Sequence, residues 1–323
     1  MFCIGSISLP IFVRDPYASA PHMTLPQPND TTSISVGWVG DMVPSGDIWY
    51  DSHVLDGVAS ELSLPDLMIG NLEGTFALPD RFSKCQYLTS MCHAFRSSGT
   101  LAWTLKRAGF DVVSLVNNHS YDFGDDGLRD TEAVLRQAGI PFISPTSPTI
   151  AITVRGKSIA ITGLSSTKPL ETITDYDYIT RTVTSLKETH DYVIVIFHGG
   201  AEGSTKTAVP GTVEYMGDEN RGDVQKVAYT AIDAGADLVL GSGPHVLRKV
   251  EQYKGGIIAY SLGNFVGGNE RLITTGTLGI SGIFQATLPV DATYTMLPIH
   301  VSKNGTPSID PLNQAGLLLQ NLK

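Results

Sequence analysis

Five apolar segments of the sequence each end in a side chain that can bind a metal ion. The segment ends read GWVGDMVPSGD, IGNLEG, VNNHSYD, IVIFHGGAEG and VLGSGPHV, and they supply Asp41, Glu73, Asn118, His198 and His245. Carboxylate oxygens, amide oxygens and imidazole nitrogens are ligands for Mn, Zn or Fe, and the set contains no thiolate, which softer metals prefer. The pattern therefore predicts a site for one or two divalent ions.

Each of these residues also has a simpler interpretation. Asp41 after Gly40 could cap a turn or a helix, Glu73 could be solvated, and Asn118 could serve a turn. His198 could be a hydrogen-bonded core histidine. Five separate segments with the same kind of ending favour a common pocket over five unrelated causes.

A divalent ion in such a pocket would lower the pKa of a bound water and polarise a phosphoryl or carbonyl oxygen. His119, next to the candidate ligand Asn118, suits protonation of a leaving group. Asp122 could orient the His119 imidazole through a hydrogen bond. The residues thus predict hydrolysis, with His119 and Asp122 as its acid–base pair.

These side chains can meet only if strands carry them to one edge of a sheet, where α/β proteins bind their ligands. Apolar runs predict strands at 33–40, 66–74 with a break at Asn71, 111–118, 191–200, 237–246, 280–290 and 293–302. Helical spacing predicts helices at 53–63, 100–110, 127–140 and 223–236, and turn glycines predict hairpins at 149–164 and 247–265. Late antiparallel strands after the alternating part indicate mixed sheets.

The chain divides into three regions. Residues 1–32, rich in proline, are expected to form an irregular leader or an export signal, with Ala18-Ser19-Ala20 resembling a cleavage site. Residues 33–302 are expected to form one α/β domain, and residues 303–323 a C-terminal tail. No apolar run in the sequence is long enough to span a bilayer.

Composition limits the function classes. The 323 residues are 42% hydrophobic and carry a net charge of −10, from 22 basic and 32 acidic residues. Such a chain lacks the basic face of a general nucleic-acid binder. The three cysteines include no CxxC pair, which argues against a structural zinc site. Cys85 and Cys92 could form a disulfide or remain free thiols.

The same segment ends resemble the CapA family of poly-γ-glutamate capsule biosynthesis proteins. The resemblance runs from about Gly37 to Phe265 and rests on the blocks GDMV, NLEG, NNHSYDFG, FHGGAEG, GADLVLGSGPHVLRKVE and YSLGNF. It implies a calcineurin-like metallophosphatase fold, a four-layer α/β/β/α sandwich with two mixed sheets flanked by helices.

The resemblance also implies roles for individual residues. Asp41 matches the carboxylate ligand of the first strand, and Glu73 lies where related phosphoesterases place a bridging acid. Asn118 matches the amide ligand and His119 its catalytic neighbour. His198 and His245 match the late histidine ligands.

The sequence departs from the family pattern in the last block. GSGPH stands where family members often have GHGPH or GHHPH, so Ser242 and Gly243 replace two possible ligands. Hydroxyl oxygen binds these metals less well than imidazole, so the number of ions, one or two, stays open.

Four further residues are candidates for substrate binding. Arg221, near the start of a predicted helix, could meet an anionic substrate or form a surface ion pair. Glu202 could contact substrate or be solvated, and Asn264 could reach the pocket or serve a turn. Asn71, in the NLEG block, is the fourth candidate.

The resemblance implies a protein of poly-γ-glutamate biosynthesis that acts as a metal-dependent hydrolase on a phosphoester or a polymer-linked amide. Two alternatives stay open: a non-catalytic binding or scaffold subunit of a capsule synthesis or export complex, and an intracellular metallophosphoesterase unrelated to capsule. The expected partners are an anionic polymer or phosphoester substrate and membrane capsule-synthesis subunits, but no nucleic acid. Export or association with the cell envelope is favoured over the cytoplasm. An acidic polymer would also need a local cationic patch or bridging cations, and the few basic residues near the predicted pocket, mainly Arg221, Arg248 and Lys249, leave both open.

Overall fold

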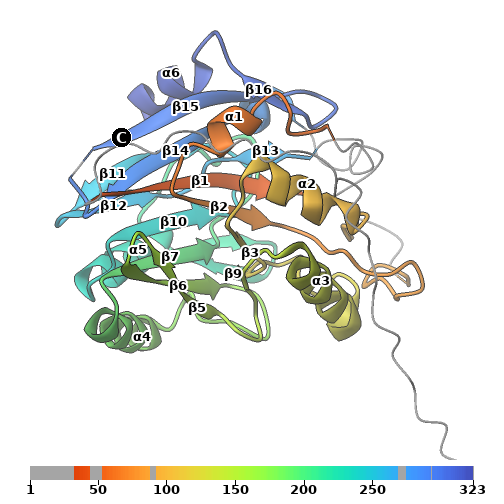
Figure 1. Ribbon diagram of the computed structural model, residues 1–323, viewed down its shortest axis with the longest axis horizontal. Helices are drawn as coiled ribbons and strands as arrows, with labels where there is room; N and C mark the ends of the chain where they lie inside the picture. The colour runs from red at the N-terminus through yellow and green to blue at the C-terminus, as the bar shows by residue number, and fades with distance from the viewer. Residues whose placement is uncertain (1–32, 44–52, 88–91, 268–273, 292, 323) are drawn as a thin grey trace, which may run out of the picture.

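The structure is a computed structural model that describes residues 33–43, 53–87, 92–267, 274–291 and 293–322. The expected leader, 1–32, lies outside the described residues. Two large mixed sheets form the centre of the molecule, and helices flank them (Figure 1).

The first sheet has the order β16-β15-β14-β1-β2-β3-β4, and β13 pairs with β1 beside this path. The strands from β1 to β4 are parallel, β13 is parallel to β1, and β14 to β16 are antiparallel. The bounds are β1 (Ile34–Met42), β2 (Leu67–Leu72), β3 (Val112–Ser114), β4 (Phe142–Ile143), β13 (Asn264–Val266), β14 (Ile280–Leu288), β15 (Tyr294–Val301) and β16 (Pro307–Ile309).

The second sheet has the order β11-β12-β10-β7-β6-β5. Its central strands are parallel, and an antiparallel strand closes each edge. The bounds are β5 (Thr149–Val154), β6 (Lys157–Ser165), β7 (Tyr192–His198), β10 (Leu238–Ser242), β11 (Val250–Tyr253) and β12 (Gly256–Ala259). A separate hairpin is formed by β8 (Glu214–Met216) and β9 (Glu219–Gly222).

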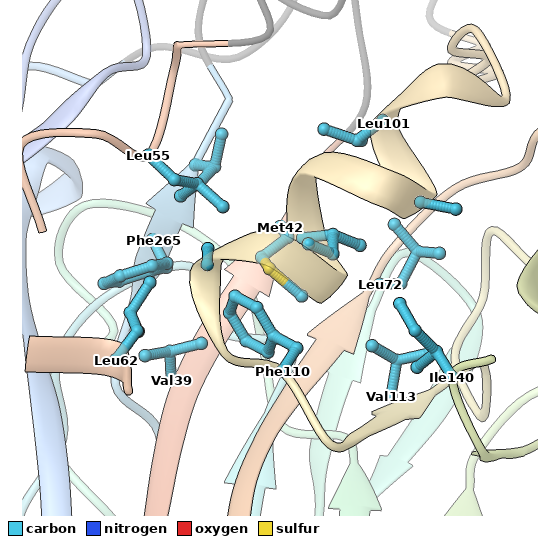
Figure 2. Close-up of a cluster of buried hydrophobic side chains, with 14 of the residues drawn as sticks. Val39, Met42, Leu55, Leu62, Leu72, Leu101, Phe110, Val113, Ile140 and Phe265 are labelled. Carbon is cyan, nitrogen blue, oxygen red and sulfur yellow. The ribbon is translucent and has the colours of Figure 1, made fainter. Parts of the chain in front are cut away.

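Alternating side chains divide the apolar residues among three layers of core. Val36 and Trp38 of β1 and Ile194 of β7 belong to the core between the two sheets. Val39, the neighbour of Trp38, faces the opposite core, under the helices α1 (Ala59–Leu62), α2 (Thr100–Ala108) and α3 (Gly124–Ala138), part of which Figure 2 shows. Val195 of β7 packs under α4 (Tyr176–Thr189) and α5 (Val224–Asp233). The four-layer α/β/β/α prediction is therefore confirmed.

The two sheets are also joined by a polar contact. The indole N–H of Trp38, a fully buried side chain, donates a hydrogen bond to the carbonyl oxygen of Gly241 at 3.3 Å. Since Trp38 lies in β1 and Gly241 in β10, this bond crosses from one sheet to the other, close to the strand ends that carry the candidate site.

The helices differ from prediction in several places. Only Ala59–Leu62 is helical within the expected helix 53–63, because the preceding residues form i→i+3 turns around Gly57, a residue that costs a helix interior about 1 kcal/mol. The helix expected at 127–140 begins at Gly124. The sequence analysis missed α4, whose residues are rich in threonine and therefore weak helix formers.

The C-terminal region and the cysteines can now be placed. Residues 303–323, set apart as a tail, contain β16, which pairs with β15, and α6 (Gln314–Asn321), whose Ala315 enters the inter-sheet core. Cys85 and Cys92 form a disulfide. Within the described ranges, no helix is both long and apolar enough to cross a membrane.

Candidate metal centre

The strand ends of the two sheets bring four of the predicted metal ligands together in the interior: Asp41, Glu73, His198 and His245. The strand register places Asp41 of β1 beside Asn71 of β2 and Asn264 of β13, and it places His198 of β7 beside Ser242 of β10. Gly40 makes this close approach possible, because a side chain there would collide with the carbonyl oxygen of Gly263. Each sheet thus delivers its own group of side chains to one place.

Glu73, directly after β2, lies at the centre of the site and is fully buried. Its Oε1 atom lies 3.7 Å from Nε2 of His198, 3.8 Å from Nε2 of His245 and 3.9 Å from Nε2 of His119. One carboxylate oxygen is therefore surrounded by three imidazoles, one at the end of β7 and two from the loops after β3 and β10. The ligand atoms of Asp41, Glu73 and His245 all lie within 4.8 Å of one another.

Four buried atoms at these positions have no hydrogen-bond partner within the described part of the chain: both carboxylate oxygens of Glu73, Oδ1 of Asn118 and Nε2 of His198. An unpaired buried polar atom costs about 1–3 kcal/mol, so such atoms seldom gather without cause. All four are oxygen or nitrogen ligands of the type that Mn, Zn and Fe accept. The residues present therefore fit a divalent metal ion.

The two late histidines are held with Nε2 facing Glu73. Ser242 Oγ donates to the carbonyl oxygen of Phe197 and lies 3.0 Å from Nδ1 of His198. When the hydroxyl proton is donated to Phe197, Ser242 accepts the Nδ1 proton of His198, and this tautomer leaves the lone pair on Nε2. His245 Nδ1 likewise faces two acceptors, Oδ1 of Asn264 at 3.0 Å and Oδ2 of Asp41 at 3.1 Å.

The departure noted at Ser242 and Gly243 has a structural consequence. The Ser242 hydroxyl lies behind the His198 ring and is occupied by it, so it orients a candidate ligand instead of adding one. Gly243 has φ of 114°, and a Cβ there would lie 2.9 Å from the carbonyl oxygen of Gly199. The backbone at position 243 therefore leaves no room for an imidazole.

Two asparagine side chains, Asn71 and Asn117, form a chain of hydrogen bonds that ends on Asp41. The Nδ2 group of Asn71 donates to Oδ1 of Asp41 at 2.8 Å, and Nδ2 of Asn117 donates to Oδ1 of Asn71 at 3.0 Å. Asn117 also accepts the backbone N–H of His119. Asn71, predicted to bind substrate, is fully buried and bonded to protein at both ends of its amide. Asn117 was not among the predicted site residues, although its place beside Asn118 was visible.

The two side chains predicted to act as an acid–base pair, His119 and Asp122, are in contact. Nδ1 of His119 lies 2.8 Å from Oδ2 of Asp122, and the Asp122 side chain is fully buried. This contact fixes the imidazole so that its other nitrogen, Nε2, faces Glu73.

The surroundings shift the pKa values of the two carboxylates in opposite directions. Burial, reinforced by the charge of Asp41, raises the pKa of Glu73 well above its ordinary value. Burial would raise the pKa of Asp41 too, but the hydrogen bond from His245 and the charges of His245 and His198 outweigh it and lower that pKa.

The histidines are shifted in opposite directions as well. Burial lowers the pKa of His198 well below its ordinary value, with help from the charge of Arg221, and burial also lowers the pKa of His119. For His245, burial opposes the charged form, but Glu73 and Asp41 raise its pKa to about 10. His198 is therefore ready to offer a lone pair, whereas His245 would release a proton when it binds a metal.

The remaining candidates for substrate binding are Arg221, Glu202 and Asn264, and Arg221 lies deeper than expected. Arg221 is fully buried: its Nε donates to the carbonyl oxygen of Gly200, and one terminal nitrogen lies 3.2 Å from Oε1 of Glu202. Glu202 is 20% exposed and lies 3.9 Å from Nε2 of His245, so it borders the site on the solvent side. Asn264 contacts His245, as described above.

The other proposed cations have acidic partners. Arg248 is fully buried and forms a two-point ion pair with Glu214 at 2.7 and 2.8 Å. Lys249 pairs with Glu251. Both side chains therefore already have an acidic partner within the chain.

The fold and site define a two-sheet α/β protein with a buried carboxylate–histidine centre. Residues 20–269 match the sequence model of the family described as bacterial capsule synthesis protein PGA_cap, and the chain belongs to this family. This confirms the family that the strand-end motifs indicated.

Individual relatives agree with this assignment. The chain is similar to the capsule biosynthesis protein CapA of Bacillus anthracis, with 29% identity over 234 residues, 66% of this chain and 53% of the relative. It is also similar to the PGA biosynthesis protein CapA of Bacillus subtilis, with 30% identity over 179 residues, 50% of this chain and 44% of the relative. The chain therefore spans about half the length of these two curated relatives.

The fold was also compared with solved structures. A hypothetical protein from Thermus thermophilus aligns in structure with a TM-score of 0.49 and 18% identity, over 82% of this chain and 98% of the other.

Proposed function

We propose that this chain is a metal-dependent hydrolase in the synthesis of poly-γ-glutamate capsule. Membership of the capsule synthesis family and the names of the Bacillus relatives support the capsule role. The observation that carries the hydrolase role is the set of four buried atoms on Glu73, Asn118 and His198 that have no hydrogen-bond partner among the described residues.

Two overlapping groups of residues would hold metal. Asp41, Glu73 and His245 form one group. Glu73 and His198, whose facing atoms lie 3.7 Å apart, would form the other together with the buried Oδ1 of Asn118, so Glu73 would be common to both. A divalent ion there would supply a water of lowered pKa and polarise a phosphoryl or carbonyl oxygen of the substrate. One group would serve with one ion, and both with two.

His119 would act on the leaving group. Its imidazolium form can give the Nε2 proton to a departing alkoxide or amine, while Asp122 accepts the Nδ1 hydrogen bond and keeps the ring in place. The phosphoester and the polymer-linked amide both need this proton, so the residues present suit either substrate.

The assay that tests the function uses protein loaded separately with Mn, Zn and Fe. Hydrolysis of an alkyl phosphate, whose leaving alkoxide needs the proton, and of poly-γ-glutamate is measured for the wild type and for His119→Gln. We expect metal content to be unchanged in the variant and kcat to fall by about 10²- to 10⁴-fold. Arg129→Ala, at a side chain that is 67% exposed, is the control that should keep full turnover. Metal-loaded wild-type protein that hydrolyses neither substrate would contradict the proposal.

A second candidate is a non-catalytic binding or scaffold subunit of a capsule synthesis or export complex. The observation in its favour is Ser242, which orients His198 where an additional imidazole ligand would have been expected. A binding subunit would retain poly-γ-glutamate after its metal is removed by a chelator, whereas a hydrolase that uses metal to hold the anionic polymer would release it.

The location of the protein is part of the proposal. We expect export or attachment to the cell envelope, with membrane capsule-synthesis subunits as partners. Fractionation of cells that make the protein tests this, and recovery of all of it from the cytoplasm would instead favour an intracellular phosphoesterase unrelated to capsule.

A further inference from the structure

The segment from Lys84 to Phe95 contacts the His119–Asp122 pair at both of its ends. The backbone N–H of Lys84 donates to the carbonyl oxygen of Asp122 at 2.8 Å, and Nζ of Lys84 lies 2.6 Å from Oδ1 of the same residue. At the other end, the N–H of Phe95 donates to Oδ2 of Asp122 at 2.6 Å. The Phe95 ring also packs on the His119 ring, with 4.4 Å between the ring centres.

These contacts complete the environment of the buried Asp122 carboxylate. Oδ2 accepts from Phe95 and faces Nδ1 of His119, whereas Oδ1 has no hydrogen-bond partner in the described ranges and lies against the Lys84 ammonium group. A buried carboxylate that loses its counter-ion is strongly destabilised. The position of Lys84 therefore decides how firmly Asp122 holds His119.

The disulfide joins the two ends of this segment. Cys85 directly follows Lys84, and Cys92 precedes Phe95 by three positions. Phe95 has a second anchor, because its carbonyl oxygen accepts the N–H of Thr75. The Lys84 side chain is 37% exposed at the edge of the site, and Cys85 ties it to the anchored end.

We propose that Lys84 and Phe95 are positioning residues for His119, and that the Cys85–Cys92 disulfide holds Lys84 on Asp122. This inference rests on the proposed role of His119 in hydrolysis. Opening the disulfide would free Lys84 more than Phe95, since Phe95 keeps its bond to Thr75. Activity would then depend on the redox state of the surroundings.

The test measures the His119–Asp122 hydrogen bond directly, without relying on turnover. The downfield proton resonance of His119 Nδ1–H is recorded for the full chain with diamagnetic Zn²⁺ and without added metal, and it is assigned by its loss in His119→Gln. We expect Cys85→Ser/Cys92→Ser to lose or shift this resonance in a protein whose remaining spectrum is folded. Cys3→Ser, which removes the remaining cysteine of the sequence, is the matched control and should leave it unchanged.

A second pair of variants keeps the disulfide intact. Lys84→Met should shift or remove the same resonance, because methionine keeps the length of the side chain but not its positive charge. Lys84→Arg should retain the resonance, because arginine keeps the positive charge beside Asp122. An unchanged resonance in Lys84→Met or in the double serine variant would overturn the proposal, as would its absence from the wild type.

Turnover then separates this proposal from the proposed function. In metal-loaded enzyme, the double serine variant should lose at least about tenfold in kcat with little change in KM or metal content. Dithiothreitol should have the same effect: it gives two electrons and two protons to the disulfide, which opens to two thiols while the reagent closes to its cyclic disulfide. A wild type without hydrolase activity contradicts the proposed function alone, because the resonance still tests the positioning of His119.

Discussion

The first sheet and the second sheet present different atoms to the candidate metal centre. Asp41 and Glu73, at the ends of β1 and β2, offer carboxylate oxygens, whereas His198, at the end of β7, offers an imidazole nitrogen. The carboxylate of Asp41 is supported by an amide of its own sheet, Asn71. The site is therefore a joint product of two sheets with separate ligand chemistries.

His245 shows how closely the two contributions depend on each other. It follows β10 of the second sheet, but its Nδ1 atom contacts Asn264 in β13 and Asp41 in β1, both in the first sheet. Its φ of 60° lies in the left-handed region that few residues other than glycine adopt. The backbone at the end of the second sheet is thus held in an uncommon conformation by contacts to the first.

The largest expected effect follows from removing the one carboxylate that both sheets surround. Glu73→Gln keeps the shape of the side chain but removes its charge, so metal affinity should fall by more than about 100-fold. Glu202→Gln makes the same change at the border of the site and should lower affinity by less than about tenfold. Competition with a fluorescent chelator measures both, and equal losses in the two variants would show that Glu73 has no special place.

An intermediate effect is expected from the residues that orient the histidines. Ser242→Ala removes the acceptor for His198, and Asn264→Ala removes one acceptor for His245. Each should weaken metal binding by about 10- to 100-fold, with metal still bound at high concentration. Titration calorimetry checks this, with the surface residue Ser158→Ala as the control, and unchanged affinity in both variants would contradict the role given to these side chains.

The smallest effect on metal is expected at the contact that joins the sheets. Trp38→Phe removes the indole hydrogen bond to Gly241 and should lower the free energy of unfolding by about 1–3 kcal/mol. Metal content should not change, because β1 and β10 remain packed through the inter-sheet core. Denaturant unfolding and elemental analysis measure the two quantities, and Trp103→Phe in α2 controls for the volume removed. Loss of metal in Trp38→Phe alone would show that the sheets need this bond to align the site.

The sequence predicted the side chains that meet at the candidate site better than it predicted the residues that support them. An apolar strand that ends in Asp41 or His198 is a local pattern, and the periodicity that defines the strand also locates its polar end. The contact between Ser242 and His198 depends on strand register across 44 positions of sequence, which no local pattern encodes. The same holds for Lys84 and Asp122, because their contact depends on a turn and a disulfide.

The helices also show that tertiary contacts, which local sequence does not reveal, can outweigh intrinsic helix propensity. The expected helix at 53–63 has apolar residues at helical spacing, but Gly57 weakens it and only its last residues are helical. In α4, weak helix formers conceal a helix that is stabilised by packing of Ile179 and Val183 on the second sheet and by the cap at Asp175. Tertiary packing decides both cases.

The central claim is that a divalent metal lies between the carboxylates of the first sheet and the histidines of the second. Anomalous diffraction from crystals grown with Mn²⁺ or Zn²⁺ tests it most directly. We expect a peak within coordination distance of the Glu73 carboxylate, with either His198 or His245 as a further ligand, and two such peaks if both groups are filled. No peak at Glu73, or a peak elsewhere in the molecule alone, would contradict the account.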